Sequence, residues 1–256
     1  MFKIATWNVN SLKVRLLHVL TWIEEEKPDV LALQETKCVD ENFPVNEIEE
    51  AGYQVNFTGQ KTYNGVATIS KSQIKTISKS LPNYSDEQKR VLAINTRNII
   101  ILNIYVPNGS EINSEKYKYK LKWFSKLQAF VKKLQKENDR LIILGDFNIA
   151  PHDRDVHDPK EWEGCVLVSK PERDEFEKLL SNNMTDCFRI FNNEKGGFSW
   201  WDYRAASFRR NRGVRIDHIL ASKSISKSCK ACYVDKSPRK LDRPSDHTPV
   251  VAEFDI

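Results

Sequence analysis

The chain has 256 residues, of which 40% are hydrophobic and 10% aromatic, and its 40 Lys and Arg against 35 Asp and Glu give a formal net charge of +5. Because it holds only 9 Gly and 10 Pro, the composition excludes a disordered, collagen-like or low-complexity protein. No apolar run approaches the roughly 20 residues that cross a bilayer, so we expect a cytoplasmic protein without a membrane partner.

Short runs rich in Val, Ile and Leu recur along the chain and predict buried strands. In chain order these strands are Phe2–Trp7, Val30–Leu33, Val66–Ile69, Val91–Ile94, Ile99–Val106, Leu141–Leu144, Ile216–Leu220 and Thr248–Phe254. Strands that alternate with helical segments predict a layered α/β fold. Since no Pro/Gly/Ser-rich linker interrupts the pattern, we expect residues 1–256 to form a single domain.

Three segments have the spacing of amphipathic helices, namely residues 13–26, the stretch that follows Ser114, and residues 172–182. The first is expected to bury Val14, Leu17, Leu20 and Ile23. The second is the longest, and Ser114 is its predicted N-cap. Its apolar stripe is Tyr117, Leu121, Phe124, Leu127, Val131 and Leu134. We expect its lysines to form a solvated face rather than a nucleic-acid site; they are Lys116, Lys118, Lys120, Lys122, Lys126, Lys132, Lys133 and Lys136.

Acidic and amide residues gather where the predicted strands end. The group comprises Asn8, Glu35, Asp146, Asn148, Asp217 and Asp246. One such acid alone is ordinarily a turn or helix-cap residue, but several carboxylates at one sheet edge repel each other and call for a shared cation. Oxygen ligands without Cys favour Mg²⁺ or Mn²⁺ over zinc, and these ions suit phosphate chemistry. His247 beside this group is a candidate proton donor to phosphate, with Asp217 to orient it and raise its pKa.

Residues 198–215 interleave five arginines with five aromatic residues and contain a single acid, Asp202. Arginine pairs bidentately with phosphate, and aromatic rings offer stacking faces to bases, so the segment predicts contact with nucleic acid. The five cysteines are scattered along the chain and do not resemble a disulfide framework. The spacing Cys229-x-x-Cys232 lacks a second pair, and we interpret it as structural rather than as a zinc or redox site.

Eight motifs in order resemble those of the exonuclease III family of DNA-repair nucleases. They are Trp7–Leu12, Leu33–Lys37, Gly59–Lys61 with Gly65–Ala67, Asn103–Gly109, Gly145–Pro151, Phe198–Trp200, Arg215–His218 and Ser245–His247. The resemblance spans residues 7 to 247. It implies a four-layer α/β sandwich, DNase I-like, in which two mixed β-sheets are flanked by helices.

The resemblance also implies roles for individual residues. Glu35 would bind the metal, supported by Asn8 and Asp246. Asp146 would orient or deprotonate the attacking water with Asn148 beside it, and Asp217 and His247 would form an acid–imidazole pair. The substrate would be contacted by a further set of residues. Tyr105 and Asn108 would touch the scissile phosphate, Trp200 would line a pocket for a base-free sugar, and Lys37, Arg204, Arg209, Arg210 and Arg212 would touch the DNA backbone, within an arginine loop running to Arg215.

The implied activity is Mg²⁺-dependent hydrolysis of double-stranded DNA 5′ to an abasic site, or at a blocked 3′ end, to leave a 3′-hydroxyl in base excision repair. Mn²⁺ is expected to substitute for Mg²⁺, and the enzyme is expected to be a monomer. The alternatives are a phosphatase of a small phosphorylated ligand and a binder of nucleic acid that does not cut it. Residues 152–159 and Val214 depart from the family pattern, so the balance of endonuclease, 3′-phosphatase and 3′→5′ exonuclease activities stays open.

Overall fold

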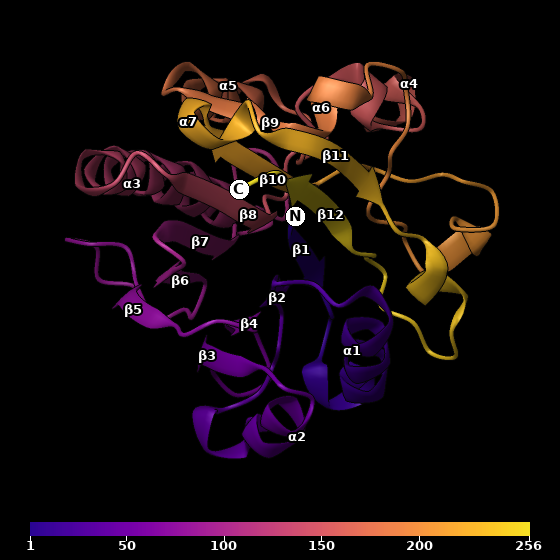
Figure 1. Ribbon diagram of the computed structural model, residues 1–256. Coiled ribbons are helices and arrows are strands. Elements are labelled where there is room, and N and C mark those ends of the chain that lie inside the picture. The colour runs from indigo at the N-terminus through magenta and orange to yellow at the C-terminus, as the bar shows by residue number, and fades with distance from the viewer.

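A computed structural model describes residues 1–256, and its strands form two six-stranded sheets (Figure 1). The first sheet has the order β11-β12-β1-β2-β4-β3, with β1 Phe2–Asn8, β2 Val30–Gln34, β3 Gln54–Thr58, β4 Val66–Ser70, β11 Cys229–Val234 and β12 Val250–Phe254. The second has the order β5-β6-β7-β8-β10-β9, with β5 Lys75–Ser78, β6 Val91–Thr96, β7 Ile99–Tyr105, β8 Leu141–Asp146, β9 Met184–Asp186 and β10 Asp217–Ser222. Each sheet contains one parallel pair, β1–β2 or β7–β8, among antiparallel pairs, so both are mixed as expected.

Seven α-helices and four 3₁₀ turns connect the strands. The helices are α1 Leu12–Glu26, α2 Val45–Glu50, α3 Glu115–Glu137, α4 Pro159–Trp162, α5 Lys170–Ser181, α6 Cys187–Phe191 and α7 Lys223–Ser226. The turns are η1 Asp40–Asn42, η2 Asp153–Asp155, η3 Arg204–Ala206 and η4 Ser237–Lys240. None of the helices has the length and apolar character needed to cross a membrane.

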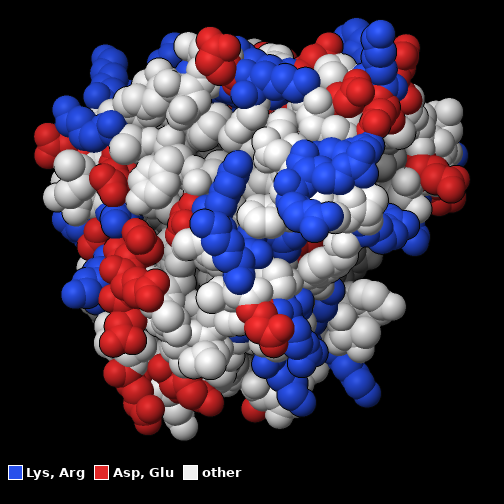
Figure 2. Space-filling model, turned by 90° about the vertical axis from the view of Figure 1, so that its right-hand side faces the viewer, with Lys and Arg blue, Asp and Glu red and all other residues white.

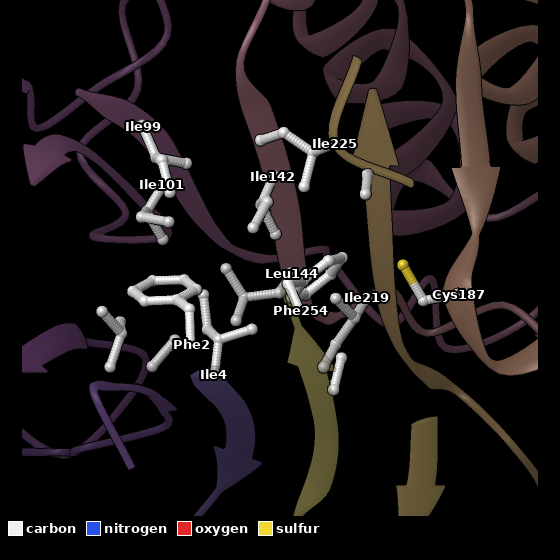
Figure 3. Close-up of a cluster of buried hydrophobic side chains, with 14 of the residues drawn as sticks. Phe2, Ile4, Ile99, Ile101, Ile142, Leu144, Cys187, Ile219, Ile225 and Phe254 are labelled. Carbon is white, nitrogen blue, oxygen red and sulfur yellow. The ribbon is translucent and has the colours of Figure 1, made fainter. Parts of the chain in front are cut away.

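The sheets pack face to face around a core of 21 buried residues drawn from both (Figure 3). Period-two alternation places Phe2 and Ile4 of β1 in this core, while Ala5 and Trp7 on the opposite face belong to the cluster under α1 and α2. A second outer cluster joins the other sheet to α3 and α5. The arrangement is helix, sheet, sheet, helix, and it confirms the predicted four-layer sandwich.

All eight predicted strands are present, with each end within two residues of its predicted position. Helix α1 forms as predicted, and Ile23 is buried and Leu20 partly buried as expected, but the other two residues of its predicted buried face are exposed. Val14 and Leu17 are 41% and 73% exposed, while Trp22 is buried and its ring lies 6.3 Å from that of Trp7. Docking of this large ring on β1 sets the rotation of the helix, so that Val19 rather than Val14 faces the sheet.

Helix α3 begins after the predicted cap, since Ser114 Oγ accepts a hydrogen bond from the Tyr117 amide at 3.1 Å. The prediction of a fully solvated lysine face is wrong at one position. Lys120 is 0% exposed and forms an ion pair with Glu172 of α5. Buried acceptors from three chain segments surround its ammonium group, which is why this lysine differs from its neighbours on the helix.

Candidate active site

Strand register brings three of the predicted catalytic residues together at one end of the second sheet. Tyr105 of β7 is paired with Asp146 of β8, and Asp146 is paired with Asp217 of β10. Residues paired across neighbouring strands point to the same face. Here that face meets the first sheet, because the Asn8 side chain at the end of β1 donates to Asp146 Oδ2 at 2.9 Å. The site therefore forms where the ends of both sheets meet.

The amide of Asn8 connects two carboxylates that come from different sheets. Its Nδ2 donates to Glu35 Oε1 and to Asp146 Oδ2, each at 2.9 Å. The Lys37 ammonium lies 2.9 Å from Glu35 Oε2. Although burial by itself would raise the pKa of Glu35, the charge of Lys37 and the Asn8 amide hold that pKa below its usual value. Glu35 is therefore a carboxylate at neutral pH.

Glu35, Asp146 and His247 each bring one possible ligand atom within 4.8 Å of the others. The two carboxylates fit a hard divalent cation. Asp246 lies outside this group, since its Oδ1 accepts from Asn10 at 2.9 Å and its Oδ2 from Trp200 at 3.0 Å. Its contacts tie the residue next to His247 to the loop after β1 and to Trp200.

His247 is held by Asp217 through its Nδ1, which donates to Asp217 Oδ2 at 2.9 Å. Its other ring nitrogen, Nε2, lies 3.8 Å from Asp146 Oδ2. Burial would lower the pKa of His247, but the Asp217 and Asp146 carboxylates outweigh burial and raise that pKa to about 10. At neutral pH the ring is therefore an imidazolium, and Nε2 is a proton donor rather than a metal ligand.

Sequence reasoning missed Ser199 as a member of this group. Its hydroxyl donates to Asp217 Oδ2 at 2.6 Å and also accepts the Asp217 backbone N–H at 3.1 Å. The motif Phe198-Ser199-Trp200 was noted for its aromatic residues, and the serine between them was the signal. Ser199 fixes the carboxylate that in turn fixes His247.

Asp146 has the environment of a general base. Its Oδ1 accepts the Asn148 backbone N–H at 2.9 Å. Burial raises the pKa of Asp146 to about 7; the His247 charge opposes this shift, and the neighbouring Asp217 carboxylate adds to it. A raised pKa makes Asp146 a stronger proton acceptor than an ordinary carboxylate.

Two asparagines lie beside this base and present their amides to one another. Asn108 Nδ2 donates to Asn148 Oδ1 at 3.0 Å, and Asn148 Nδ2 donates to the Val106 carbonyl at 2.9 Å.

Tyr105, which is paired with Asp146 across β7 and β8, has a partly buried ring next to an arginine: the Arg90 guanidinium lies 4.4 Å from the centre of the Tyr105 ring. Burial and the nearby Glu35 carboxylate raise the pKa of Tyr105 well above its usual value, so its hydroxyl stays protonated.

One glycine is required for this geometry. Gly145 has a φ of 146°, and a Cβ there would lie 1.9 Å from the Ile104 carbonyl oxygen of the neighbouring strand. Only glycine allows β7 and β8 to approach this closely directly before Asp146.

Comparison with known proteins agrees with the geometry of the site. A model of the Endonuclease/Exonuclease/phosphatase family matches residues 5–247. The chain belongs to the Endonuclease/Exonuclease/phosphatase family. Within the family, exodeoxyribonuclease III of Haemophilus influenzae is 35% identical, over 98% of this chain and 99% of its own.

Two solved structures of the family align over the whole of both chains. One is Neisseria NExo, described as a 3′ phosphatase bound to a product DNA hairpin, at 42% identity and a TM-score of 0.96. The other is an AP endonuclease from Archaeoglobus fulgidus, at 38% identity and a TM-score of 0.96. These similarities confirm the predicted resemblance to the exonuclease III family, the predicted fold and the predicted class of hydrolytic enzyme.

Next to the candidate active site, Trp200 belongs to a group of apolar side chains, which we call the Trp200 wall. This residue forms isolated β-bridges with Val214 and His247. Its ring packs on a cluster that includes Val214 and Ile216, and the Trp162 ring meets it nearly edge-on at 6.3 Å. The two departures noted in the sequence, Val214 and residues 152–159, both contribute to this cluster, the latter through Val156.

The basic side chains predicted to touch DNA differ in their surroundings. Arg204 is paired with Asp202 at 2.6 Å, Arg212 is paired with Glu161, and Lys37 is paired with Glu35 inside the site. Arg209 and Arg210 are exposed and form no ion pair. Figure 2 shows the side of the molecule that lies on the right in Figure 1, with Lys and Arg over its centre and a run of Asp and Glu along its lower left edge.

The expectation that the arginine loop touches DNA as far as Arg215 is wrong at its last residue. Arg215 is 1% exposed, and it donates to Asp155 Oδ1 at 2.6 Å and to Asp186 Oδ2 at 2.8 Å. Two buried carboxylates need this charge, so the side chain points inward. Cys229 and Cys232 are also buried, in the core between the sheets, in agreement with a structural role.

Proposed function

We propose that this chain is a metal-dependent DNA-repair phosphodiesterase that cleaves double-stranded DNA 5′ to an abasic site or clears a blocked 3′ end. One observation carries the proposal. A base of raised pKa, Asp146, and a charged imidazole, His247, lie 3.8 Å apart beside the carboxylate of Glu35. The names of the relatives, an exodeoxyribonuclease III, a 3′ phosphatase and an AP endonuclease, support the same chemistry.

The metal that fits these residues is Mg²⁺, with Mn²⁺ as a substitute, because its ligands here would be oxygens. Glu35 would hold the ion. Asn8 would orient the Glu35 carboxylate, and Asp246 would support the site by accepting a hydrogen bond from Asn10, in the loop after β1. When bound, such an ion supplies positive charge next to the phosphoryl oxygens and lowers the cost of the charge they gain.

The side chains divide the remaining work between them. Asp146 accepts the proton of the attacking water, and the Asn148 backbone N–H fixes the direction of its carboxylate. His247 donates from Nε2 to a phosphoryl oxygen, because Asp217 keeps the ring charged and holds Nδ1. Asn108, Asn148 and the Tyr105 hydroxyl would bind the other phosphate oxygens. The water oxygen bonds to phosphorus as the P–O3′ bond breaks, and the leaving 3′ oxygen takes up a proton from solvent to become the 3′-hydroxyl. Position and charge thus account for the catalysis, with no covalent intermediate on the protein.

Recognition of the substrate would use shape and backbone rather than base identity. Arg209 and Arg210 would pair with DNA phosphates, and Arg204, Arg212 and Lys37 would add to the positive field. The Trp200 wall would receive a sugar that carries no base, as apolar area without hydrogen-bond donors suits such a group. We also propose that residues 1–256 act as one domain, because a single core joins the two sheets. We propose a monomer as well, which light scattering at the mass of one chain would check.

The test compares three duplexes, with an internal tetrahydrofuran abasic analogue, a 3′-phosphate or a normal 3′ terminus. We expect cleavage in Mg²⁺ and Mn²⁺, and a loss of about 10³-fold or more in kcat for Asp146→Asn and Glu35→Ala. The exposed-lysine variant Lys132→Met is the control. Substantial cleavage in EDTA or by Asp146→Asn would overturn the proposal, as would release of phosphate from inositol phosphates with no cleavage of any duplex. The three rates rank the activities.

A further inference from the structure

Lys120 is a buried cation directly beneath the two asparagines of the site. It lies on α3, is 0% exposed, and is paired with Glu172 of α5, which is also 0% exposed. Burying an ammonium group is costly unless all its protons find acceptors. A lysine ammonium has three N–H donors, and here all three have partners. The residue is therefore not part of the solvated lysine face.

The partners of Lys120 are the backbones of the two asparagines. Its Nζ donates to the Asn148 carbonyl at 2.6 Å, to the Asn108 carbonyl at 3.0 Å, and to Glu172 Oε1. The side chains of the same asparagines bond to each other at 3.0 Å. One ammonium group thus ties together two loops that follow different strands, β7 and β8.

The Lys120 hydrogen bond to Asn148 falls on a left-handed turn. The φ of Asn148 is 49°, in a region that asparagine adopts more readily than most non-glycine residues. This turn aims the Asn148 N–H at Asp146 Oδ1 and its side chain at Asn108. On the other loop, the Ser114 hydroxyl donates to the Gly109 carbonyl at 3.0 Å, next to the carbonyl that Lys120 holds. Both loops are therefore anchored to α3.

We propose that Lys120 is a positioning residue for phosphodiester hydrolysis, which holds Asn108 and Asn148 in the geometry that binds the phosphate and orients Asp146. The inference rests on the proposed function, since it acts through the residues that the proposal places at the scissile phosphate. Glu172 has the separate task of neutralising the lysine and capping α5, where its Oε2 accepts the Ser169 N–H at 3.1 Å. The two members of the ion pair should thus differ in their effect on catalysis.

The experiment separates positioning from stability with variants on both sides of the pair. Lys120→Met removes all three donors and leaves Glu172 unpaired. The double variant Lys120→Met with Glu172→Gln removes the donors without leaving a buried charge. It replaces the single variant in the measurements if Lys120→Met does not fold. Glu172→Gln alone is the matched control, because an amine at Lys120 still donates to both carbonyls. Lys132→Met, exposed on the same helix, controls for loss of a lysine.

We expect the folded Lys120 variants to lose about a hundredfold in kcat, the effect of roughly 1 Å of misplacement, with KM changed less than about threefold. Glu172→Gln should keep kcat within about threefold while its melting temperature falls. If Lys120 positions the Asn148 amide, Lys120→Met should cost less in the Asn148→Ala background than in wild type, because part of what it positions is already missing, whereas a general loss of structure would multiply the two effects.

Three results would overturn the inference, namely wild-type kcat in a folded Lys120 variant, a loss carried by KM alone, or multiplied effects in the Asn148→Ala background. The proposed function fails differently. If wild type cleaves none of the duplexes, or Asn148→Ala cleaves as wild type does, then the assigned site is wrong and the inference falls with it. If Asn148→Ala is impaired and the Lys120 variants are not, only the inference fails.

Discussion

Asp217 accepts the Nδ1 hydrogen bond of His247 at 2.9 Å, and the pairing of Asp217 with Asp146 across β8 and β10 sets the opposite ring nitrogen 3.8 Å from Asp146. A single charged ring is thereby placed between two carboxylates. The one at Nδ1 is fixed by Ser199, while the one near Nε2 has a pKa of about 7. The register of two strands thus gives two aspartates different surroundings, one fixed against Nδ1 of His247 and one with a raised pKa near Nε2.

Replacing Asp217 by Asn should shift the alkaline limb of activity to lower pH. Burial lowers the pKa of His247, but attraction to the charges of Asp217 and Asp146 outweighs burial and raises this pKa to about 10. Wild-type activity should therefore persist until the pH approaches 10. Without the Asp217 charge, the imidazolium loses its proton earlier, and we expect a shift of at least about one unit with a fall in kcat of roughly a hundredfold or more. The measurement is kcat between pH 6 and 10.5, with the exposed Asp139→Asn as control.

The same variant should show a pH-dependent loss of stability. A histidine whose pKa is raised on folding contributes stability that is fully present below about 6.5 and disappears as the pH rises through about 10. Urea unfolding should therefore separate wild type from Asp217→Asn most clearly near pH 6 and least at the alkaline end. An unchanged alkaline limb together with equal stability would show that the pair does not hold the imidazole charged.

The salt dependence of DNA binding should follow the two arginines that have no partner in the protein. Replacing Arg209 and Arg210 together by Ser should lower affinity for all duplexes and reduce the slope of log K against log salt by about 1.8, since each phosphate contact contributes about 0.9. Arg204 and Arg212 already neutralise acids of the protein and should each contribute less. Lys132→Ser with Lys136→Ser, on the exposed side of α3, is the charge-matched control, and an equal slope in both pairs would exclude the arginine loop as the DNA contact.

The sequence predicted the interior of both sheets and missed their borders. The four strands that were not predicted, β3, β5, β9 and β11, are the four edge strands of the two sheets. An interior strand is covered on both sides and becomes a continuous apolar run, whereas an edge strand such as Lys75–Ser78 is short and polar. A hydrophobic pattern reveals burial. The four edge strands each pair with a single neighbouring strand, and this pairing leaves little trace in the hydrophobic pattern.

The candidate site was predicted through residues whose types are unusual where a strand ends. Carboxylates and amides after apolar runs were visible in the sequence, and register then placed Asp146 opposite Asp217. The burial of Lys120 and Arg215 could not be predicted, because nothing in the local sequence distinguishes a buried basic residue from an exposed one. Only the acids packed against them, Glu172 and Asp155, distinguish the two cases, and those lie 52 and 60 residues away.

Trp200 should affect abasic substrates more than 3′ ends. Trp200→Ala removes the apolar wall and the Nε1 donor to Asp246, whereas Trp200→Phe keeps a smaller aromatic ring and loses the hydrogen bond at 3.0 Å. We expect the alanine variant to lose about ten- to a hundredfold in kcat/KM on the tetrahydrofuran duplex, as burying an apolar group against one ring is worth about 1.5–3 kcal/mol. The phenylalanine variant should lose less. Equal losses on the abasic and 3′-phosphate duplexes would show that Trp200 acts through Asp246 alone.

Arg215 should matter for stability rather than for binding, in contrast to its neighbours in the loop. Arg215→Met leaves the buried carboxylates of Asp155 and Asp186 without their main partner, and we expect the free energy of unfolding at pH 7 to fall by about 3–5 kcal/mol. Arg210→Met, exposed and without an ion pair, should change it by less than about 0.5 kcal/mol.

The effect of Arg215→Met should also depend on pH. Although burial opposes it, the Arg215 charge lowers the pKa of Asp155 to about 2. A carboxylate whose pKa is depressed on folding adds stability above its ordinary pKa, and that stability is lost as the pH falls through about 2. In the variant the acids can take up protons at higher pH, so the gap between wild type and Arg215→Met in urea unfolding should narrow from pH 7 towards pH 3. A gap that stays constant over this range would mean that lost packing of the arginine stem, rather than unpaired carboxylates, destabilises the variant.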